Sequence, residues 1–196
     1  MASHFFALFS RMKNINRWAL MRNTQEESLA VHSYEVAAVA HCLAVIGNRR
    51  LGKNYDAAKA ALIGLYHDMT EIVTGDMPTP VKYFNAEIRR AYGEIETAAE
   101  ASILQTLPED LRADFTPLIS PDGNTELYRL VKAADKLSAL IKCVEETNSG
   151  NREFRMAEAS TKRAIKDLGC AEADIFMEEF MDSYSMVLDS MLQKEK

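Results

Sequence analysis

The chain has few residues that interrupt helices, with only eight glycines and five prolines in 196 residues. Average usage is about 7% glycine and 5% proline. Apolar residues make up 47% of the chain, which excludes a disordered or collagen-like protein. The apolar stretch 60–66 is far shorter than the roughly 18 residues of a membrane span. We also expect no secretory leader, because the apolar cluster 5–9 precedes the first cations. These absences predict a single helical domain, residues 1–196, in the cytoplasm and without a membrane partner.

Cysteine and positive charge are also scarce. Cys42, Cys143 and Cys170 are odd in number and form no C-x-x-C pair. We therefore expect reduced thiols, not a disulfide framework or a zinc ribbon. The net charge of −6 repels polyanions, which argues against a nucleic-acid polymer as partner. A small phosphorylated ligand is compatible with this charge, because a few local cations or a metal ion can outweigh the weak negative potential of the whole protein.

The spacing of apolar residues predicts an all-α fold. Apolar side chains recur at helical intervals, and no segment alternates for long enough to form a sheet. The expected architecture is a helical bundle of about seven helices. Asp56 and Thr125 are expected N-caps. Helices are predicted over 3–12, 28–49, 57–73, 81–107, a short piece after Pro108 as first helical residue, 126–148, 152–168 and 171–192.

Four ionisable residues fall where a helical bundle normally places aliphatic side chains. His32 lies on the apolar stripe of its helix, His67 and Asp68 follow the apolar stretch 60–66, and Asp135 lies among alanines and leucine. Each residue alone is more often a hydrogen-bonded or ion-paired core residue. Together, two imidazoles and two carboxylates suit a divalent transition ion and leave coordination positions for water and substrate. The donor set alone leaves the ion open among Mn, Fe, Co, Ni, Cu and Zn.

Glu71 lies beside this set on the predicted helix. It comes three residues after Asp68 and four after His67, so all three share a face. This position makes Glu71 a candidate general acid or base. The alternative is an ordinary surface glutamate in the last turn of a helix.

The order of these residues resembles the H…HD…D pattern of the HD-domain metal-dependent phosphohydrolases, an all-helical superfamily. Further segments are similar to its bacterial 5'-deoxynucleotidase branch, the YfbR-like enzymes. They are N-R-W at 16–18, L-M-R at 20–22, Y-H-D at 66–68 with Glu71, T-G-D-M-P-T-P-V-K-Y-F at 74–84 and K-A-A-D at 132–135. The similar segments extend from residue 4 to about 146, and the last fifty residues match only in helical character.

The resemblance implies a function and a site. A divalent cation such as Co, Mn, Zn or Cu would be bound by His32, His67, Asp68 and Asp135. The implied reaction is hydrolysis of deoxyribonucleoside 5'-monophosphates to deoxyribonucleoside and phosphate, carried out by a homodimer. The catalytic residues would be Arg17 and Glu71, and the nucleotide would be held by Arg17, Trp18, His32, Asp68, Asp76, Met77, Pro78 and Thr79.

The residue types agree with these implied roles. Arg17 offers a planar fork of donors for phosphate oxygens, and its charge counters the acidic background locally. Trp18 offers a flat apolar surface for a sugar or base, although a tryptophan can equally be a core anchor. One departure concerns Val31, because many HD proteins carry a glutamate immediately before the first ligand histidine. Its absence removes a carboxylate that would tune His32.

Two alternatives remain at this point. One is another HD-family nucleotide phosphohydrolase, with a triphosphate or cyclic dinucleotide as substrate. A triphosphate needs more cations than the motif segments supply in Arg17, Arg22 and Lys82. The other is a non-catalytic nucleotide-binding module, which a missing metal ligand would mark, and all four ligands are present.

Overall fold

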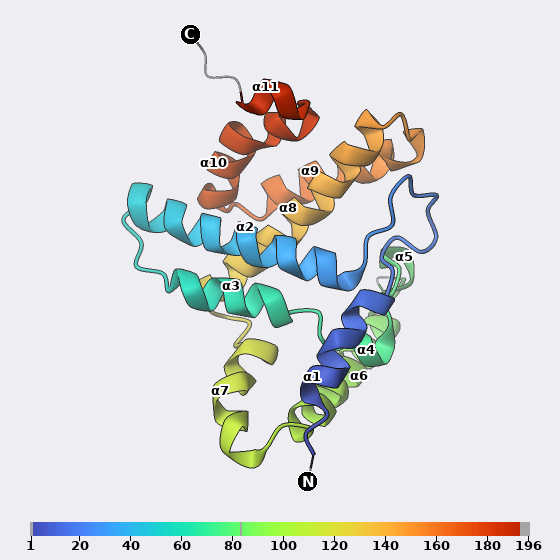
Figure 1. Ribbon diagram of the computed structural model, residues 1–196, viewed down its shortest axis with the longest axis vertical. Coiled ribbons are helices and arrows are strands. Elements are labelled where there is room, and N and C mark those ends of the chain that lie inside the picture. Colours follow the sequence, from blue (N-terminus) through green and yellow to red (C-terminus); the bar gives the residue numbers. More distant parts are fainter. Residues whose placement is uncertain (1, 83, 193–196) are drawn as a thin grey trace.

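The structure is a computed structural model that describes residues 2–82 and 84–192. Within these residues the secondary structure is helical, apart from one isolated antiparallel bridge between Asn16 and Ser28. Seven of the described helices have ten or more residues, which agrees with the expected all-α bundle (Figure 1). They are α2 (Leu29–Arg50), α3 (Ala57–Tyr66), α6 (Ala86–Gln105), α7 (Glu109–Ile119), α8 (Glu126–Asn148), α9 (Arg155–Asp167) and α10 (Ala171–Phe180).

Shorter segments connect the long helices. The short α-helices are α1 (Phe5–Phe9), α4 (Glu71–Thr74), α5 (Thr79–Lys82) and α11 (Leu188–Leu192). Three 3₁₀ segments lie at Ser10–Asn14, Arg152–Phe154 and Met181–Ser185. The expected N-caps are confirmed, because Asp56 accepts a hydrogen bond from the Lys59 amide at 2.9 Å and Thr125 accepts one from the Tyr128 amide at 3.2 Å.

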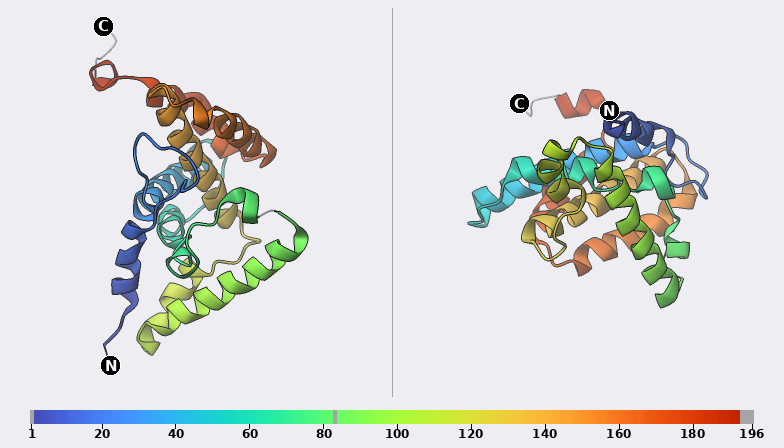
Figure 2. Two further views of the ribbon diagram at one scale, coloured as in Figure 1. Left: turned by 90° about the vertical axis from the view of Figure 1, so that its right-hand side faces the viewer. Right: turned by 90° about the horizontal axis from the view of Figure 1, so that it is seen from below.

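The main core lies where α2 packs alongside α3 and crosses α8 (Figures 1 and 2). Val36 and Leu43 of α2 pack there with Ile63 of α3 and Leu137 of α8. Gly64 allows α2 and α3 to approach closely, since a Cβ at this position would lie 3.0 Å from the Cα of Ala37. Among the described helices, α2 is long and apolar enough to cross a membrane, but half of its most apolar stretch is buried in the protein. Its apolar character thus serves the core.

A second core joins the N-terminus to the distant helices α6 and α7. Phe5 is fully buried, and its ring lies 5.2 Å from that of Phe115 and 6.3 Å from that of Tyr66. Ile103 of α6 belongs to the same cluster. Because Tyr66 is the last residue of α3, this aromatic packing holds the end of α3 where the candidate metal ligands follow.

The predicted helix 57–73 is wrong at its centre. Helix α3 ends at Tyr66, a turn covers His67 to Thr70, and α4 begins at Glu71. In a continuing α-helix the carbonyl of Gly64 would accept the amide of Asp68. Instead, this carbonyl lies 2.7 Å from Nδ1 of the His67 ring. The side chain competes with the helical bond, and both candidate ligands lie in the turn that follows α3.

Other boundaries also differ from the prediction. The helix predicted over 152–168 begins with a 3₁₀ segment, and α9 starts at Arg155. Helix α1 ends at Phe9 and continues as a 3₁₀ segment. The helix predicted over 81–107 starts at Ala86, because the side chain of Asn85 caps it by accepting the Ile88 amide at 2.8 Å. Pro108 is an N-cap and not the first helical residue. The helix predicted over 171–192 breaks after Phe180, where the chain bends to bury Met181 in the main core.

Candidate metal centre

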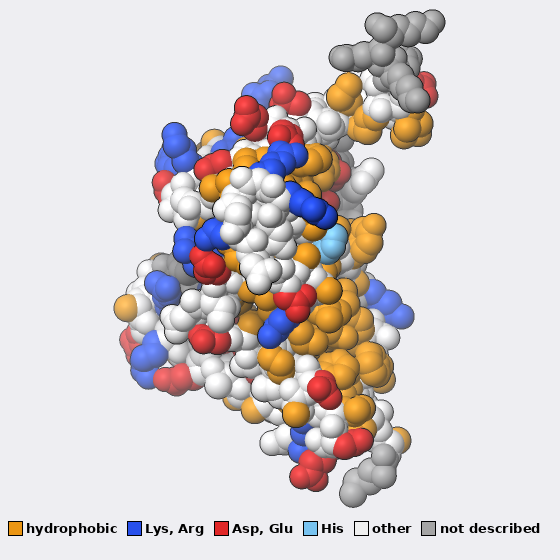
Figure 3. Space-filling view, turned by 90° about the vertical axis from the view of Figure 1, so that its left-hand side faces the viewer, with side chains coloured by type: hydrophobic (Ala, Val, Ile, Leu, Met, Phe, Trp, Pro, Cys, Tyr) orange, Lys and Arg blue, Asp and Glu red, His pale blue; other side chains and the backbone are white. Residues whose placement is uncertain are grey.

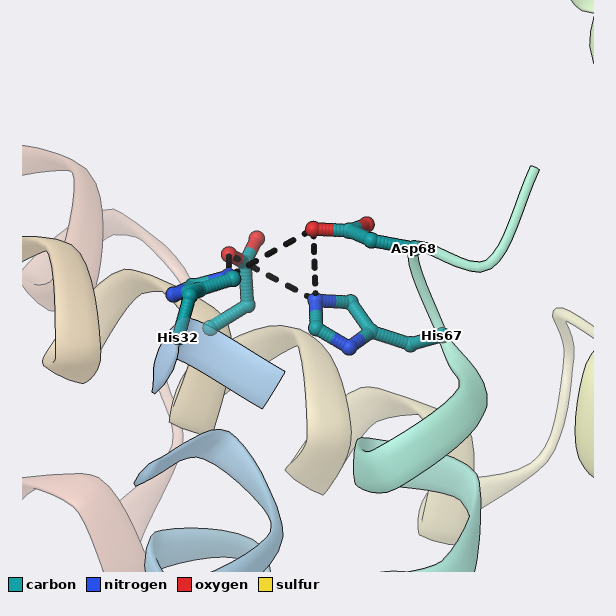
Figure 4. A group of neighbouring side chains, drawn as sticks. His32, His67 and Asp68 are labelled. Atoms are coloured by element: carbon teal, nitrogen blue, oxygen red, sulfur yellow. Dashed lines mark ion pairs between the residues drawn. The ribbon is translucent and has the colours of Figure 1, made fainter. Parts of the chain in front are cut away.

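The four predicted ligands meet in one cluster at the centre of the fold. His32 comes from α2, His67 and Asp68 from the turn after α3, and Asp135 from α8. One ligand atom of each residue lies within 4.8 Å of the others. Nε2 of His32 lies 3.2 Å from Oδ1 of Asp135 and 3.4 Å from Oδ2 of Asp68, and Nε2 of His67 lies 3.0 Å from the same Asp68 oxygen (Figure 4).

The hydrogen bonds behind both imidazoles leave Nε2 available to a cation. Nδ1 of His67 faces the Gly64 carbonyl at 2.7 Å, and a carbonyl only accepts, so this nitrogen carries the proton. Nδ1 of His32 lies 3.0 Å from Oγ of Ser138, which donates its own proton to Glu35 at 2.5 Å. Ser138 must therefore accept from His32. Metal-ligating histidines in general donate a hydrogen bond from the ring nitrogen that does not bind the metal, and this bond sets the tautomer of the ring.

The cluster satisfies the chemistry of a divalent cation site. Nε2 of His32 and Nε2 of His67 are both buried and have no hydrogen-bond partner of good geometry among the described residues. Leaving a buried polar atom unsatisfied costs about 1–3 kcal/mol. A divalent transition ion is the partner that two imidazole nitrogens and two carboxylate oxygens share. The residues present thus fit such an ion.

Electrostatics favour positive charge between the two aspartates. Burial lowers the pKa of His32, but the neighbouring carboxylates of Asp135, Asp68 and Glu27 outweigh it and raise this pKa to about 10. Burial raises the pKa of Asp135, yet the contact with His32 brings it below the ordinary value. Both shifts include the effect of charge converging at this point, and the negative charge of the carboxylates that raises the pKa of His32 would equally favour a bound cation.

Arg17 and Trp18 are held beside the cluster by one carboxylate. Nη1 of Arg17 donates to Oε1 of Glu27 at 2.9 Å, and Nε1 of Trp18 donates to Oε2 of Glu27 at 2.8 Å. The guanidinium lies 5.9 Å from the centre of the Trp18 ring. The positive charge of Arg17 is attracted electrostatically to the carboxylates of Asp135, Asp68 and Asp76. The Trp18 ring also packs against Phe154, with the two ring centres 5.3 Å apart.

The segment after α4 approaches the same place. Gly75 ends α4 with a φ of +72°, a conformation that favours glycine. Burial raises the pKa of Asp76, and a hydrogen bond from the backbone of Trp18 lowers it by a smaller amount. Met77 and Pro78 are half-buried, and Thr79 is exposed at the start of α5. The role of Met77, Pro78 and Thr79 toward a ligand stays a prediction, and residue 83 of the same motif lies outside the described residues.

Glu71 is buried near the metal ligands and not on the surface. It is the first residue of α4, and its Oε2 has no hydrogen-bond partner in the described part of the chain. Burial, together with the charges of Asp68 and Asp76, raises the pKa of Glu71 to about 9. This shift favours the protonated carboxyl, and the burial of the side chain excludes the ordinary surface glutamate that the sequence left open.

Comparison with known proteins decides the family. Residues 4–184 match the model of the family described as 5'-deoxynucleotidase YfbR-like. The chain is 47% identical to the 5'-deoxynucleotidase YfbR of Shigella flexneri serotype 5b, with 97% of this chain and 96% of that protein covered. The chain belongs to the YfbR-like 5'-deoxynucleotidase family. The resemblance inferred from the motifs is thereby confirmed.

Solved structures agree with this YfbR-like assignment at the level of the fold. An HD-domain phosphohydrolase from Listeria innocua superposes with a TM-score of 0.81 at 24% identity and covers 92% of this chain and 88% of its own. The HD phosphohydrolase of cyanophage S-2L superposes with a TM-score of 0.65 at 19% identity, covering 90% and 96% respectively. That second structure contains dA and one catalytic Zn²⁺ ion. The expected HD-domain bundle is therefore confirmed.

The departure at Val31 has a structural answer in this YfbR-like protein. The side chain of Val31 is 58% exposed on the outer face of α2. Two other carboxylates lie near Nδ1 of His32. Oε1 of Glu27 is 3.5 Å from this nitrogen, and Glu35 is linked to it by the hydroxyl of Ser138, which donates to Glu35. The tuning of the first ligand histidine thus comes from a loop and from α8, not from the preceding residue.

Sequence reasoning missed three polar residues around this YfbR-like site. Glu27 lies in a polar connection, where a glutamate is normally solvated, and Ser138 shares the face of Asp135 but carries no motif. Lys132 lies one helical turn before Asp135, so the sequence spacing places it on the same face of the helix as this ligand. Burial lowers the pKa of Lys132, but the charges of Asp135 and Asp68, with Tyr128, outweigh burial and raise it. Lys132 is thus a second positive charge near the cluster.

Proposed function

We propose that this chain is a metal-dependent 5'-deoxynucleotidase that hydrolyses deoxyribonucleoside 5'-monophosphates as a single phosphohydrolase domain. The observation that carries the proposal is the cluster of four donor residues beside Arg17, in which two buried Nε2 atoms face carboxylates but form no hydrogen bond of good geometry among the described residues. Family membership supports the substrate class, since the relatives that match most of the chain are named 5'-deoxynucleotidases.

The metal ligands in this proposal are His32, His67, Asp68 and Asp135. A divalent cation held there supplies a Lewis acid that polarises phosphoryl oxygens and activates water. The family resemblance also assigns His32 and Asp68 to the nucleotide-binding side of the site, and of these two side chains Asp68 is 20% exposed while His32 is fully buried. Ser138 and Gly64 keep the two imidazoles in the required tautomer.

The protein's own groups bind and orient the nucleotide. Arg17 binds the phosphate through guanidinium donors, one of which, Nε, is buried and without a protein partner in the described residues. Trp18 contributes an apolar surface beside the sugar or base. Asp76 to Thr79 form the wall that meets the ribose edge, where a carboxylate accepts and a hydroxyl donates hydrogen bonds.

Glu71 handles the proton in this proposal. Its protonated carboxyl suits a general acid toward the leaving alkoxide of the 5'-oxygen. The water that bonds to phosphorus releases one proton, and the Glu71 carboxylate regains its neutral form by taking up this proton through the solvent, so the leaving alcohol and the acid are both accounted for. This role assigns a function to a buried carboxyl that otherwise has an unpartnered oxygen.

A phosphate-release screen tests the proposal. Metal-free protein is mixed with Mn²⁺, Co²⁺, Zn²⁺ or Cu²⁺ and with deoxy- and ribonucleoside 5'-monophosphates. We expect inorganic phosphate from the deoxyribonucleotides in the presence of a cation. Pyrophosphate release from triphosphates, or cleavage of cyclic dinucleotides only, would instead assign another HD-family substrate. Nucleotide binding without turnover under any cation would assign a binding module.

We also propose that the enzyme is a homodimer. Large apolar side chains are exposed on α1, α2 and α3, including Phe6 at 59%, Val31 at 58%, Tyr34 at 73% and Leu62 at 44%. The space-filling view shows hydrophobic side chains gathered on one side of the molecule (Figure 3). Apolar patches of this kind mark protein interaction sites. Light scattering on a gel-filtration column should give twice the monomer mass of 22.0 kDa, and a monomer would reject the dimer.

We propose the cytoplasm as the compartment. All three cysteines are free, and Cys143 and Cys170 are buried. Reduced, buried thiols are typical of proteins in a reducing compartment. Fractionation of cells followed by detection of the protein checks the location, and recovery from the periplasm or the membrane would overturn it.

A further inference from the structure

One buried carboxylate links the residues that meet the phosphate to the metal centre. Glu27 is only 7% exposed although it lies in a polar loop. Its Oε1 accepts from Nη1 of Arg17 at 2.9 Å and lies 3.5 Å from Nδ1 of His32, and its Oε2 accepts from Nε1 of Trp18 at 2.8 Å. Both oxygens are thus engaged, and each holds a group with a role in the proposed site.

The backbone around Glu27 is arranged to place these groups. The amide of Arg17 donates to the carbonyl of Glu27 at 2.9 Å, and the amide of Leu29 donates to the carbonyl of Ile15 at 2.8 Å. Residues 15–29 therefore form a loop closed at its base. Trp18 lies in that loop with a φ of +59°, a conformation that side chains with a Cβ rarely adopt. Strained residues of this kind persist only where the surrounding structure holds them.

We propose that Glu27 is the positioning residue that orients Arg17 and Trp18 toward the ligand and holds both against the His32 side of the metal centre. This inference rests on the proposed function, because it takes Arg17 to bind the phosphate of the substrate. Glu27 engages only Nη1 of the guanidinium and leaves Nε without a protein partner in the described residues. The arginine is therefore held by one edge and keeps donors for a phosphate.

A carboxylate is required for this task, and a carboxamide is not sufficient. Glu27 offers two acceptor oxygens to two N–H donors. In Glu27→Gln one of those oxygens becomes an NH₂ group, which must face a donor of either Arg17 or Trp18. The substitution keeps the size of the side chain while removing one hydrogen bond and the charge. Glu26 is a matched control, because it is the adjacent residue of the same type and is exposed.

The first arm of the test uses fluorescence, which does not depend on turnover. Trp18 is the sole tryptophan of the chain, so its emission reports on this contact directly. We expect Glu27→Gln to shift the emission maximum and to increase quenching by acrylamide, while Glu26→Gln matches the wild type. Titration with inorganic phosphate should show at least tenfold weaker binding in Glu27→Gln. Co²⁺ affinity, measured by calorimetry, should stay within about threefold, because the four ligands are unchanged and Ser138, 3.0 Å from Nδ1 of His32, still accepts its proton, whereas Glu27 is 3.5 Å away.

The second arm uses kinetics and a double-mutant cycle. Loss of a hydrogen bond to a charged group predicts a fall in kcat/KM of about 10- to 100-fold in Glu27→Gln. Since Glu27 acts in part through Arg17, Glu27→Gln should lower kcat/KM by a clearly smaller factor in the Arg17→Ala background than in the wild type, the remainder coming from Trp18. A purely structural role would instead make the two losses multiply. Glu27→Asp keeps both acceptors and the charge, so it should retain more activity than Glu27→Gln, and it serves as the second variant if Glu27→Gln does not fold.

The outcomes separate this inference from the proposed function. Unchanged fluorescence and phosphate binding in Glu27→Gln, or multiplying losses in the cycle, would overturn the role of Glu27 even in an active enzyme. A wild type that releases no phosphate from any deoxyribonucleotide would reject the proposed function. The fluorescence and phosphate titrations would still decide the role of Glu27 in that case.

Discussion

A second buried carboxylate, Glu146 near the end of α8, provides the sharpest test of how the substrate loop is held. Glu146 is 1% exposed and forms an ion pair with Lys142 of the same helix. It accepts the amide and hydroxyl of Thr24 at 2.9 and 2.8 Å, the amide of Gln25 at 3.2 Å, and Nδ2 of Asn151 at 2.8 Å. One side chain thus ties the loop that carries Arg17 and Trp18 to the core helix.

Glu146→Ala would leave Lys142 buried with the carbonyl of Gln25 as its remaining partner. Removing one member of a buried ion pair costs about 3–5 kcal/mol. In a chain of this size, each kcal/mol changes the melting temperature by about 2–4 °C. The expected decrease in Tm is therefore about 6–20 °C. Glu145→Ala is the control, since Glu145 is exposed on the same turn and surface substitutions usually change stability by less than about 0.5 kcal/mol.

The pH dependence has a defined sign. Burial would raise the pKa of Glu146, but hydrogen bonds from Lys142, Asn151 and Thr24 outweigh it and hold this pKa at about 2, below the ordinary 4.5. The stabilisation is fully present above pH 4.5 and is lost as the pH falls toward 2. Thermal unfolding between pH 7 and pH 3 should show the gap between wild type and Glu146→Ala becoming smaller. A Tm for Glu146→Ala within 2 °C of Glu145→Ala at pH 7, or a gap independent of pH, would refute this reasoning.

Three further predictions concern the metal centre. Asp68→Asn and Asp135→Asn should each abolish Co²⁺ binding in calorimetry and phosphate release, and full activity in either variant would reject the site. Glu71→Ala should keep its metal affinity while kcat falls by about 10²-fold, the scale of lost acid–base catalysis; unchanged kcat would remove Glu71 from the mechanism. Ser138→Ala should weaken metal binding by about 10- to 100-fold in chelator competition, because His32 loses the partner that sets its tautomer. Affinity equal to wild type would show that Glu27 alone suffices for this purpose.

Much of the fold follows from local patterns in the sequence. The apolar spacing along α2 and α8 and the caps Asp56 and Thr125 depend on residues within one or two turns of each other, so they are readable without the tertiary structure. The break after Tyr66 was not readable in this way. The bond between the His67 ring and the Gly64 carbonyl is local, but no sequence pattern distinguishes it from the helical bond that it replaces, and the aromatic packing around Tyr66 involves distant segments.

The candidate ligands themselves were also within reach of sequence reasoning, because a charged residue on an apolar face is conspicuous. The residues that surround these ligands could not be predicted from the sequence. Ser138 is 106 residues from His32, and Glu27 lies in a segment whose composition predicts solvent exposure. A glutamate in such a connection looks the same whether it is hydrated or buried, since the difference arises from a partner elsewhere in the chain.

The sequence by itself therefore determined the helical class, the donor types and the family, since periodicity and motifs are properties of neighbouring residues. Only the tertiary structure decided that a turn and not a helix presents His67 and Asp68. It also decided that Glu27 and Ser138 set the first histidine where Val31 cannot, and that Glu146 anchors the loop carrying Arg17. The physical reason is that burial and hydrogen-bond partners are created by packing between distant segments, and a linear pattern contains neither.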